Sequence, residues 1–314
     1  MNKIVKIATP IFAAALIAGA LVGCGGQAAS SSASASPASS SATAPASQSA
    51  ETKATAEETV AQLKEAMANA KDFKSVTITH KVATEVDTSK IQNSDSAQSA
   101  SASSSDSADS GAASASASSE SASINVSTDY KIDQSGEAVK ASSSTNLGGS
   151  TFNAYLDGDK AVIEIDGEAY AGTAEEMSVH EMTSVDELLK TKVGDFETIM
   201  SCVSAADVAK QGSNTVYALT VDTEKYAQAD ELEKALADAG LKKELFAVSY
   251  EFGADGKLLS VSVFETTSLG TTESTLNFTD YDTTVVGQAP ETDKTYADMN
   301  ADIKAAVDDV LNEQ

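Results

Sequence analysis

The stretch FNAYLDGDKAVIEIDGEAYA, residues 152–171, decides the fold that this sequence predicts. Apolar and polar residues alternate through it, and Asp157-Gly158 and Asp166-Gly167 interrupt the alternation. A period of two is typical of a half-buried β-strand, and Asp-Gly between two such runs favours a tight hairpin turn. The stretch therefore predicts three consecutive antiparallel strands.

The same period of two recurs on both sides of this stretch. It appears upstream in 75–87, 124–132 and, more weakly, 139–147, and downstream in 216–222, 245–252, 258–267 and 272–281. We expect one antiparallel sheet of about 9 to 11 strands. A twisted sheet of that size must curl, because it does not stay flat.

Helical spacing of apolar residues appears at the start, in the middle and near the end of the chain. Thr55 with Glu58 and Ser184 with Glu187 have the spacing of a helix capping box. Further helical patterns occupy 196–203, 232–239 and about 295–312. We expect an α+β fold, in which a single curled antiparallel sheet forms a half-barrel with amphipathic helices on its concave side.

Strand parity indicates which side chains point toward the concave side. His80 shares the parity of its apolar neighbours, and we expect a hydrogen-bonded core histidine rather than a ligand contact. A lipid pocket and a packed core both need apolar residues facing inward, so parity leaves a cavity and a solid interior open. The candidate cavity lining comprises Val76, Ile78, His80, Val82, Val126, Tyr130, Phe152, Leu156, Ile163, Phe246, Phe252 and Val261.

The first 24 residues have the pattern of a bacterial export signal. Lys3 and Lys6 precede an apolar run that is too short to span a bilayer. The following Leu21-Val22-Gly23-Cys24 resembles the lipobox of bacterial lipoproteins. That resemblance implies cleavage after Gly23 and acyl chains such as palmitate on Cys24. We expect a lipid-anchored protein on the extracytoplasmic face of the cell membrane, because several acyl chains anchor stably.

Composition divides the chain into parts. We expect a signal peptide in 1–23, the lipidated cysteine and a Ser/Ala-rich tether in 24–54, the half-barrel domain in 55–290 and a C-terminal amphipathic helix in 291–314. Residues 94–123 are mostly Ser and Ala and interrupt a strand pattern. They have too little apolar surface to offset the entropy of ordering, so we expect a disordered insertion in the domain.

Charge and the scarcity of reactive side chains exclude several classes of function. The formal net charge is -26, which loss of Lys3 and Lys6 makes -28, so nucleic acid is not an expected partner. Cys202 is the only cysteine besides Cys24, and we expect it to be buried and inert. His80 and His180 lie far apart, and no metal, nucleophile-elbow or P-loop motif occurs. The sequence predicts no catalytic residues, no metal and no cofactor, and therefore not an enzyme.

The order of elements resembles the LolA-like superfamily, and within it the LppX and LprG type of actinobacterial lipoproteins. The resemblance spans about 56–290 and is carried by 60–87, which resembles the opening helix and first strand, by the hairpin 154–170, and by the closing strand 281–290. It implies a half-barrel that binds or carries a lipid or other hydrophobic ligand across the cell envelope. The alternative is a non-catalytic envelope interaction or accessory lipoprotein with a filled core. An open apolar cavity would favour the first function and a solid interior the second.

Overall fold

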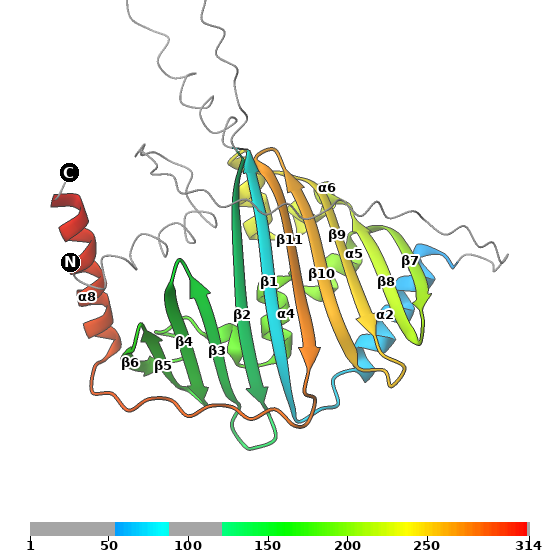
Figure 1. Ribbon diagram of the computed structural model, residues 1–314. Helices are drawn as coiled ribbons and strands as arrows, with labels where there is room; N and C mark the ends of the chain where they lie inside the picture. The colour runs from blue at the N-terminus through cyan, green and yellow to red at the C-terminus, as the bar shows by residue number, and fades with distance from the viewer. Residues whose placement is uncertain (1–53, 88–120, 313–314) are drawn as a thin grey trace, which may run out of the picture.

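An antiparallel sheet of eleven strands forms the centre of the protein (Figure 1). The computed structural model describes residues 54–87 and 121–312. The order across the sheet is β6-β5-β4-β3-β2-β1-β11-β10-β9-β8-β7, so the first and last strands lie side by side in the middle. The strands are β1 (Ser75–Asp87), β2 (Ser121–Asp133), β3 (Lys140–Leu147), β4 (Ser150–Asp157), β5 (Lys160–Ile165), β6 (Glu168–Thr173), β7 (Val203–Gln211), β8 (Asn214–Val221), β9 (Lys243–Phe252), β10 (Leu258–Thr267) and β11 (Gly270–Thr279).

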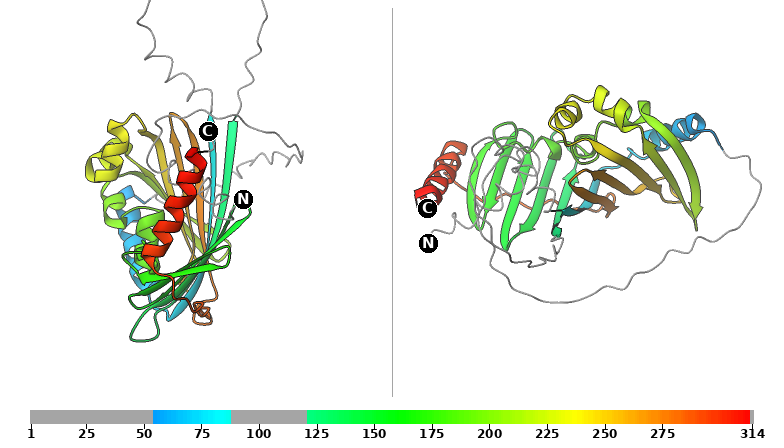
Figure 2. Two further views of the ribbon diagram at one scale, coloured as in Figure 1. Left: turned by 90° about the vertical axis from the view of Figure 1, so that its left-hand side faces the viewer. Right: turned by 90° about the horizontal axis from the view of Figure 1, so that it is seen from above.

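The helices lie mainly on one side of this sheet, which curls without closing (Figures 1 and 2). Side-chain caps start them as the sequence predicts. The Thr55 hydroxyl accepts from the backbone N–H of Glu58 at 3.2 Å, and Ser184 caps the N–H of Glu187 at 3.1 Å. The α+β half-barrel expected from the sequence is thereby confirmed. The helices are α2 (Ala56–Asn69), η1 (His180–Met182, a 3₁₀ turn), α4 (Val185–Lys192), α5 (Phe196–Ser201), α6 (Thr223–Ala229), α7 (Glu231–Asp238) and α8 (Tyr296–Asn312).

The strand order determines what covers the concave face. Because β6 and β7 are the two edges of the sheet, the chain between them must pass from one edge to the other. Residues 174–202, here named the crossover segment, do so along the concave side and carry η1, α4 and α5. Their buried apolar side chains fill part of the half-barrel. These are Ala174, Met177, Val179, Met182, Leu188, Leu189, Val193, Ile199, Met200 and Cys202.

The C-terminal segment covers the edge at β6. The backbone N–H of Ala171 donates to the carbonyl of Lys294 at 2.9 Å, and Ala171 forms a parallel bridge with Thr295. α8 follows and lies beside β6 (Figure 1). An edge strand whose backbone groups are paired offers less of a template for association with another chain.

Four elements differ from the sequence expectation, and the first is the closing strand that the resemblance places at 281–290, where the structure has a turn and irregular chain. The pattern in 196–203 predicts one helix, but α5 ends at Ser201 and Val203 begins β7, which no pattern had indicated. α6 was also not expected. β2 begins at Ser121, where Ser121–Ser123 pair with β1, so the last three residues of the expected insertion 94–123 belong to the sheet.

Within residues 54–87 and 121–312, no helix has the length and apolar composition that crossing a bilayer needs. The signal peptide 1–23, Cys24, the tether as far as residue 53 and residues 94–120 of the expected insertion lie outside the described residues. The export signal and the lipidation site therefore remain predictions from the sequence.

Candidate functional site

The twelve residues predicted to line a cavity fall into two groups in the structure. Phe246, Phe252 and Val261 lie on β9 and β10, where they are buried. Aromatic pairs close this half: the ring of Phe246 is 5.0 Å from that of Tyr226 on α6, and the Phe252 ring is 5.8 Å from that of Tyr217. This half of the concave face is thus a packed core.

The other nine residues lie on β1, β2, β4 and β5, where burial decreases along the strands. Inward-facing residues pair across these strands in rows. The row that contains Val76 is sealed, since its members are 0 to 3% exposed. That row consists of Val76, Ile132, Ala141, Leu156 and Ala161.

The next rows toward the upper end of β1 in Figure 1 are progressively less covered. Ile78 and Tyr130 are still buried, but Ile163 in the same row is half-buried. Phe152, Val82 and Val126 are all half-buried. The concave face of β1–β5 is therefore closed at one end and partly open at the other.

A group of polar side chains lies where β1 and β2 pass from their buried part to their half-buried part. His80 pairs with Thr128 and Thr128 with Thr145, whereas Ser274 lies in the next row, where it pairs with Val82. We name these four residues the polar belt. Within it, Nε2 of His80 and Oγ of Ser274 are 2.8 Å apart, and the hydroxyls of Thr128 and Thr145 are 2.7 Å apart.

The belt is electrically neutral. Burial, together with the nearby Lys192 ammonium, lowers the pKa of His80 to about 4, although the Glu181 carboxylate acts in the opposite direction. The imidazole is therefore uncharged near neutral pH. This agrees with the expectation of a hydrogen-bonded histidine in the core.

The crossover segment contributes a charged pair beside Tyr130, which lies one row from His80 and Thr128. The Tyr130 hydroxyl donates to Oε1 of Glu181 at 3.1 Å, and Nζ of Lys192 lies 3.0 Å from the same oxygen. Burial, and then the Glu181 charge, raises the pKa of Tyr130. The tyrosine thus stays protonated and ties η1 to β2.

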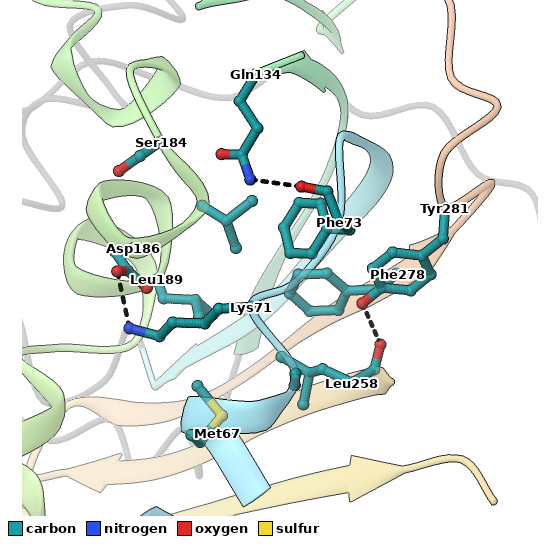
Figure 3. A pocket seen from close by; sticks show the side chains of 12 residues that line it. Met67, Lys71, Phe73, Gln134, Ser184, Asp186, Leu189, Leu258, Phe278 and Tyr281 are labelled. Atoms are coloured by element: carbon teal, nitrogen blue, oxygen red, sulfur yellow. Dashed lines mark hydrogen bonds and ion pairs between the residues drawn. The ribbon is translucent and has the colours of Figure 1, made fainter. Parts of the chain in front are cut away.

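A small pocket opens between the sheet and the helices α2 and α4 (Figure 3). It holds about 80 Å³ between α2, α4 and the ends of β10 and β11. Nζ of Lys71 and Oδ2 of Asp186 are 2.8 Å apart at its rim. Pockets for drug-sized ligands span roughly 300–1,000 Å³, so this one is too small for a lipid in the present arrangement. Its apolar lining consists of Met67, Ala70, Phe73, Val185, Leu189, Leu258, Phe278 and Tyr281.

The remaining chemistry-bearing residues form no reactive site in the part of the chain that the structure describes. Cys202 is buried, and His180 is exposed at the start of η1. Among residues 54–87 and 121–312, no three His, Cys, Asp or Glu side chains are arranged to hold a metal ion.

Sequence reasoning missed Thr128, Thr145 and Ser274 as members of the candidate site. Their signal was available, because each shares the inward parity of apolar neighbours on its strand. It also missed Glu181 and Lys192, which only the path of the crossover segment brings above β2.

The sequence matches no protein-family model and no curated protein. Solved structures with a similar fold include LprF from Mycobacterium bovis, with 10% identity, a TM-score of 0.39, and coverage of 76% of this chain and 97% of LprF. Lipoprotein LppX from Mycobacterium tuberculosis matches with 13% identity and a TM-score of 0.38, covering 73% of this chain and 97% of LppX. A putative outer membrane lipoprotein-sorting protein domain from Vibrio parahaemolyticus matches with 11% identity, a TM-score of 0.26, and coverage of 74% and 95%.

Proposed function

We propose that this protein is an extracytoplasmic lipoprotein, anchored through Cys24, that binds a lipid or other hydrophobic ligand on the concave face of its sheet. The observation that carries the proposal is the graded burial of that face. Val82, Val126 and Phe152 point inward yet stay half-buried, whereas the row at Val76 is sealed. Apolar side chains that remain partly exposed in a concave surface are typical of ligand sites.

The crossover segment suits a wall that adapts to a ligand. Met177, Met182 and Met200 are among its buried residues. Methionine side chains are flexible and polarisable, so they repack around occupants of different shape at modest cost. We therefore propose that the candidate site binds a ligand and carries out no catalysis. The sequence contains none of the catalytic motifs considered above.

The most direct test of the ligand is mass spectrometry of lipids extracted from protein purified out of its native membrane. We expect one class of lipid in stoichiometric amount, retained after washing. The same measurement is made on a variant whose inward face is blocked, for example Val126→Trp. If the variant retains as much lipid as the unaltered protein, the lipid does not bind at this face.

The anchor is tested separately by metabolic labelling with palmitate. The Cys24→Ala variant should carry no label and remain incompletely processed, whereas the matched control Cys202→Ala should be labelled like the unaltered protein. Label in Cys24→Ala contradicts the lipobox interpretation.

A second function has an observation in its favour. The half of the concave face at β9 and β10 is closed by helices and aromatic pairs, and the pocket beside α4 holds only about 80 Å³. A filled half-barrel would be a scaffold whose acidic surface binds envelope partners. The absence of any retained lipid favours this accessory function.

A further inference from the structure

The half-open part of the concave face has an apolar region and a polar boundary. Val82 and Val126 are paired across β1 and β2, and Phe152 is paired with Thr145 of the polar belt. All three apolar side chains are half-buried. An alkyl chain lying on them would run alongside the belt, because Val82 also pairs with Ser274.

The belt has hydrogen-bonding capacity that its internal bonds do not exhaust. Each hydroxyl of Thr128, Thr145 and Ser274 has one donor and two acceptor positions. The bonds of 2.7 Å between the threonines and 2.8 Å from His80 to Ser274 use only part of them. The belt can therefore form further hydrogen bonds, and Thr145 is its most exposed member, since the other three are 7 to 8% exposed.

Charge at this boundary disfavours an anionic group. Glu181 and Lys192 are paired at 3.0 Å, so their charges balance each other, and burial keeps His80 uncharged. No cation of the belt is left to pair with a carboxylate, and Glu181 repels one. The net charge of -26 adds a repulsive field over the whole chain.

We propose that, given a hydrophobic ligand on this face, the ligand is an uncharged amphiphile whose ester or hydroxyl group bonds to the polar belt while its alkyl chain lies on Val82, Val126 and Phe152. The inference rests on the proposed function and specifies its ligand class. A fatty acid of the same chain length binds more weakly, because its carboxylate loses hydration at an uncharged site next to Glu181.

The sequence contains no tryptophan, so Phe152→Trp places a single indole beside the belt. The mature chain from residue 24, with Cys24→Ser to omit the anchor, is titrated with 1-monopalmitoylglycerol and with palmitate at pH 7.5. We expect a blue shift of the indole emission with both and at least tenfold tighter binding of monopalmitoylglycerol. A double substitution, Thr128→Val with Ser274→Ala, should weaken monopalmitoylglycerol about 3- to 30-fold, the range for losing one or two hydrogen bonds, and leave palmitate unchanged.

The control is Thr79→Val, which removes a hydroxyl from the opposite face of β1, where Thr79 donates to Asp129 at 2.7 Å. It should leave both affinities unchanged. Equal affinity for the two lipids overturns the proposal that the ligand is uncharged. The proposal that this face binds a hydrophobic ligand is then retained. No emission change with either lipid overturns the proposed function as well. If the double variant does not fold, the ratio of the two affinities in the reporter protein alone decides.

Discussion

The hydroxyl of Tyr226 lies directly against Gly194. A Cβ at Gly194 would be 2.5 Å from that oxygen, and the φ angle of this residue is +117°. Gly194 separates α4 from α5 within the crossover segment, and Tyr226 belongs to α6. The absence of a side chain at this one position therefore lets the crossover segment and α6 pack together.

Gly194→Ala should destabilise the protein in two ways, because the methyl group displaces Tyr226 and the backbone conformation is unfavourable for an L-residue. We expect a loss of at least about 2 kcal/mol in the free energy of unfolding. Gly240→Ala is the matched control: its φ is +85°, but nothing lies within 4 Å of the added Cβ. It should cost only the backbone strain, about 1 kcal/mol. Equal losses in urea denaturation of the two variants contradict the contact.

His80 should make stability depend on pH below about 6.5. Its pKa is lowered to about 4 in the folded protein, first by burial and then by Lys192. Between pH 6.5 and 4 the unfolded chain binds a proton at this residue and the folded chain does not. Its contribution to stability is complete above 6.5 and is lost as pH falls, by about 1.4 kcal/mol per unit.

His80→Gln should remove this part of the pH dependence and leave the contribution of the carboxylates. The measurement is the difference in free energy of unfolding between the variant and the unaltered protein at pH 7 and pH 5. His180→Gln, at an exposed position, is the control and should track the unaltered protein. If the free energy of unfolding changes by the same amount between pH 7 and pH 5 in all three proteins, His80 is not buried in its neutral form.

These side chains show where prediction from the sequence succeeds and where it stops. Alternation identified β1, β2 and β9, because one face of each is buried and the other is not. β7 escaped notice because an edge strand has one neighbour, and most of its residues are exposed. α6 has a single buried residue, Tyr226, and follows the strand β8 directly, so Asp222 was read as the strand's end rather than as a helix cap.

The sequence predicted which side chains of the candidate site point inward, but not how deeply each is buried. Parity correctly assigns Ile78 and Val82 to the same face of β1, yet one is sealed and the other half-buried. That difference depends on where residues 174–202 cross the sheet. A path between distant edges is a tertiary property, which local periodicity does not contain.

Lys243 should be important for stability because it lies half-buried between two carboxylates. Its Nζ lies 2.8 Å from Glu233 on α7 and 2.7 Å from Glu265 on β10. Burial alone would lower the pKa of Lys243, but the charges of Glu265 and Glu233 outweigh it and raise the pKa. Lys243→Met leaves both carboxylates without their cation and should cost about 3 to 5 kcal/mol.

The control for this prediction is Lys234→Met. Lys234 pairs with Asp238 at 2.6 Å on α7, but both side chains are mostly exposed. Exposed pairs contribute up to about 1 kcal/mol. In thermal and urea unfolding, Lys243→Met should therefore lose much more stability than Lys234→Met. If both variants lose a similar, small amount of stability, α7 does not depend on Lys243.

The final prediction compares two tryptophan substitutions on the same concave face. Ile78 is 0% exposed and pairs with Phe278 on one side and Tyr130 on the other. Ile78→Trp over-packs this site and should cost about 1 to 3 kcal/mol or more. Val126 is half-buried in the open region beyond the polar belt, so Val126→Trp should cost less than about 1 kcal/mol.

Ligand binding should be affected in the opposite way: the variant that loses less stability should lose more affinity. Val126→Trp fills space on which the ligand's alkyl chain is proposed to lie, so it should weaken binding of monopalmitoylglycerol while the fold is retained. Ile78→Trp lies in the row behind the polar belt, and any of it that folds should bind with nearly unchanged affinity. If both variants lose stability equally and neither changes lipid binding, the concave face is packed throughout. The protein is then a scaffold whose outer surface carries its function, because a ligand site requires the face at Val126 to be less tightly filled than the face at Ile78.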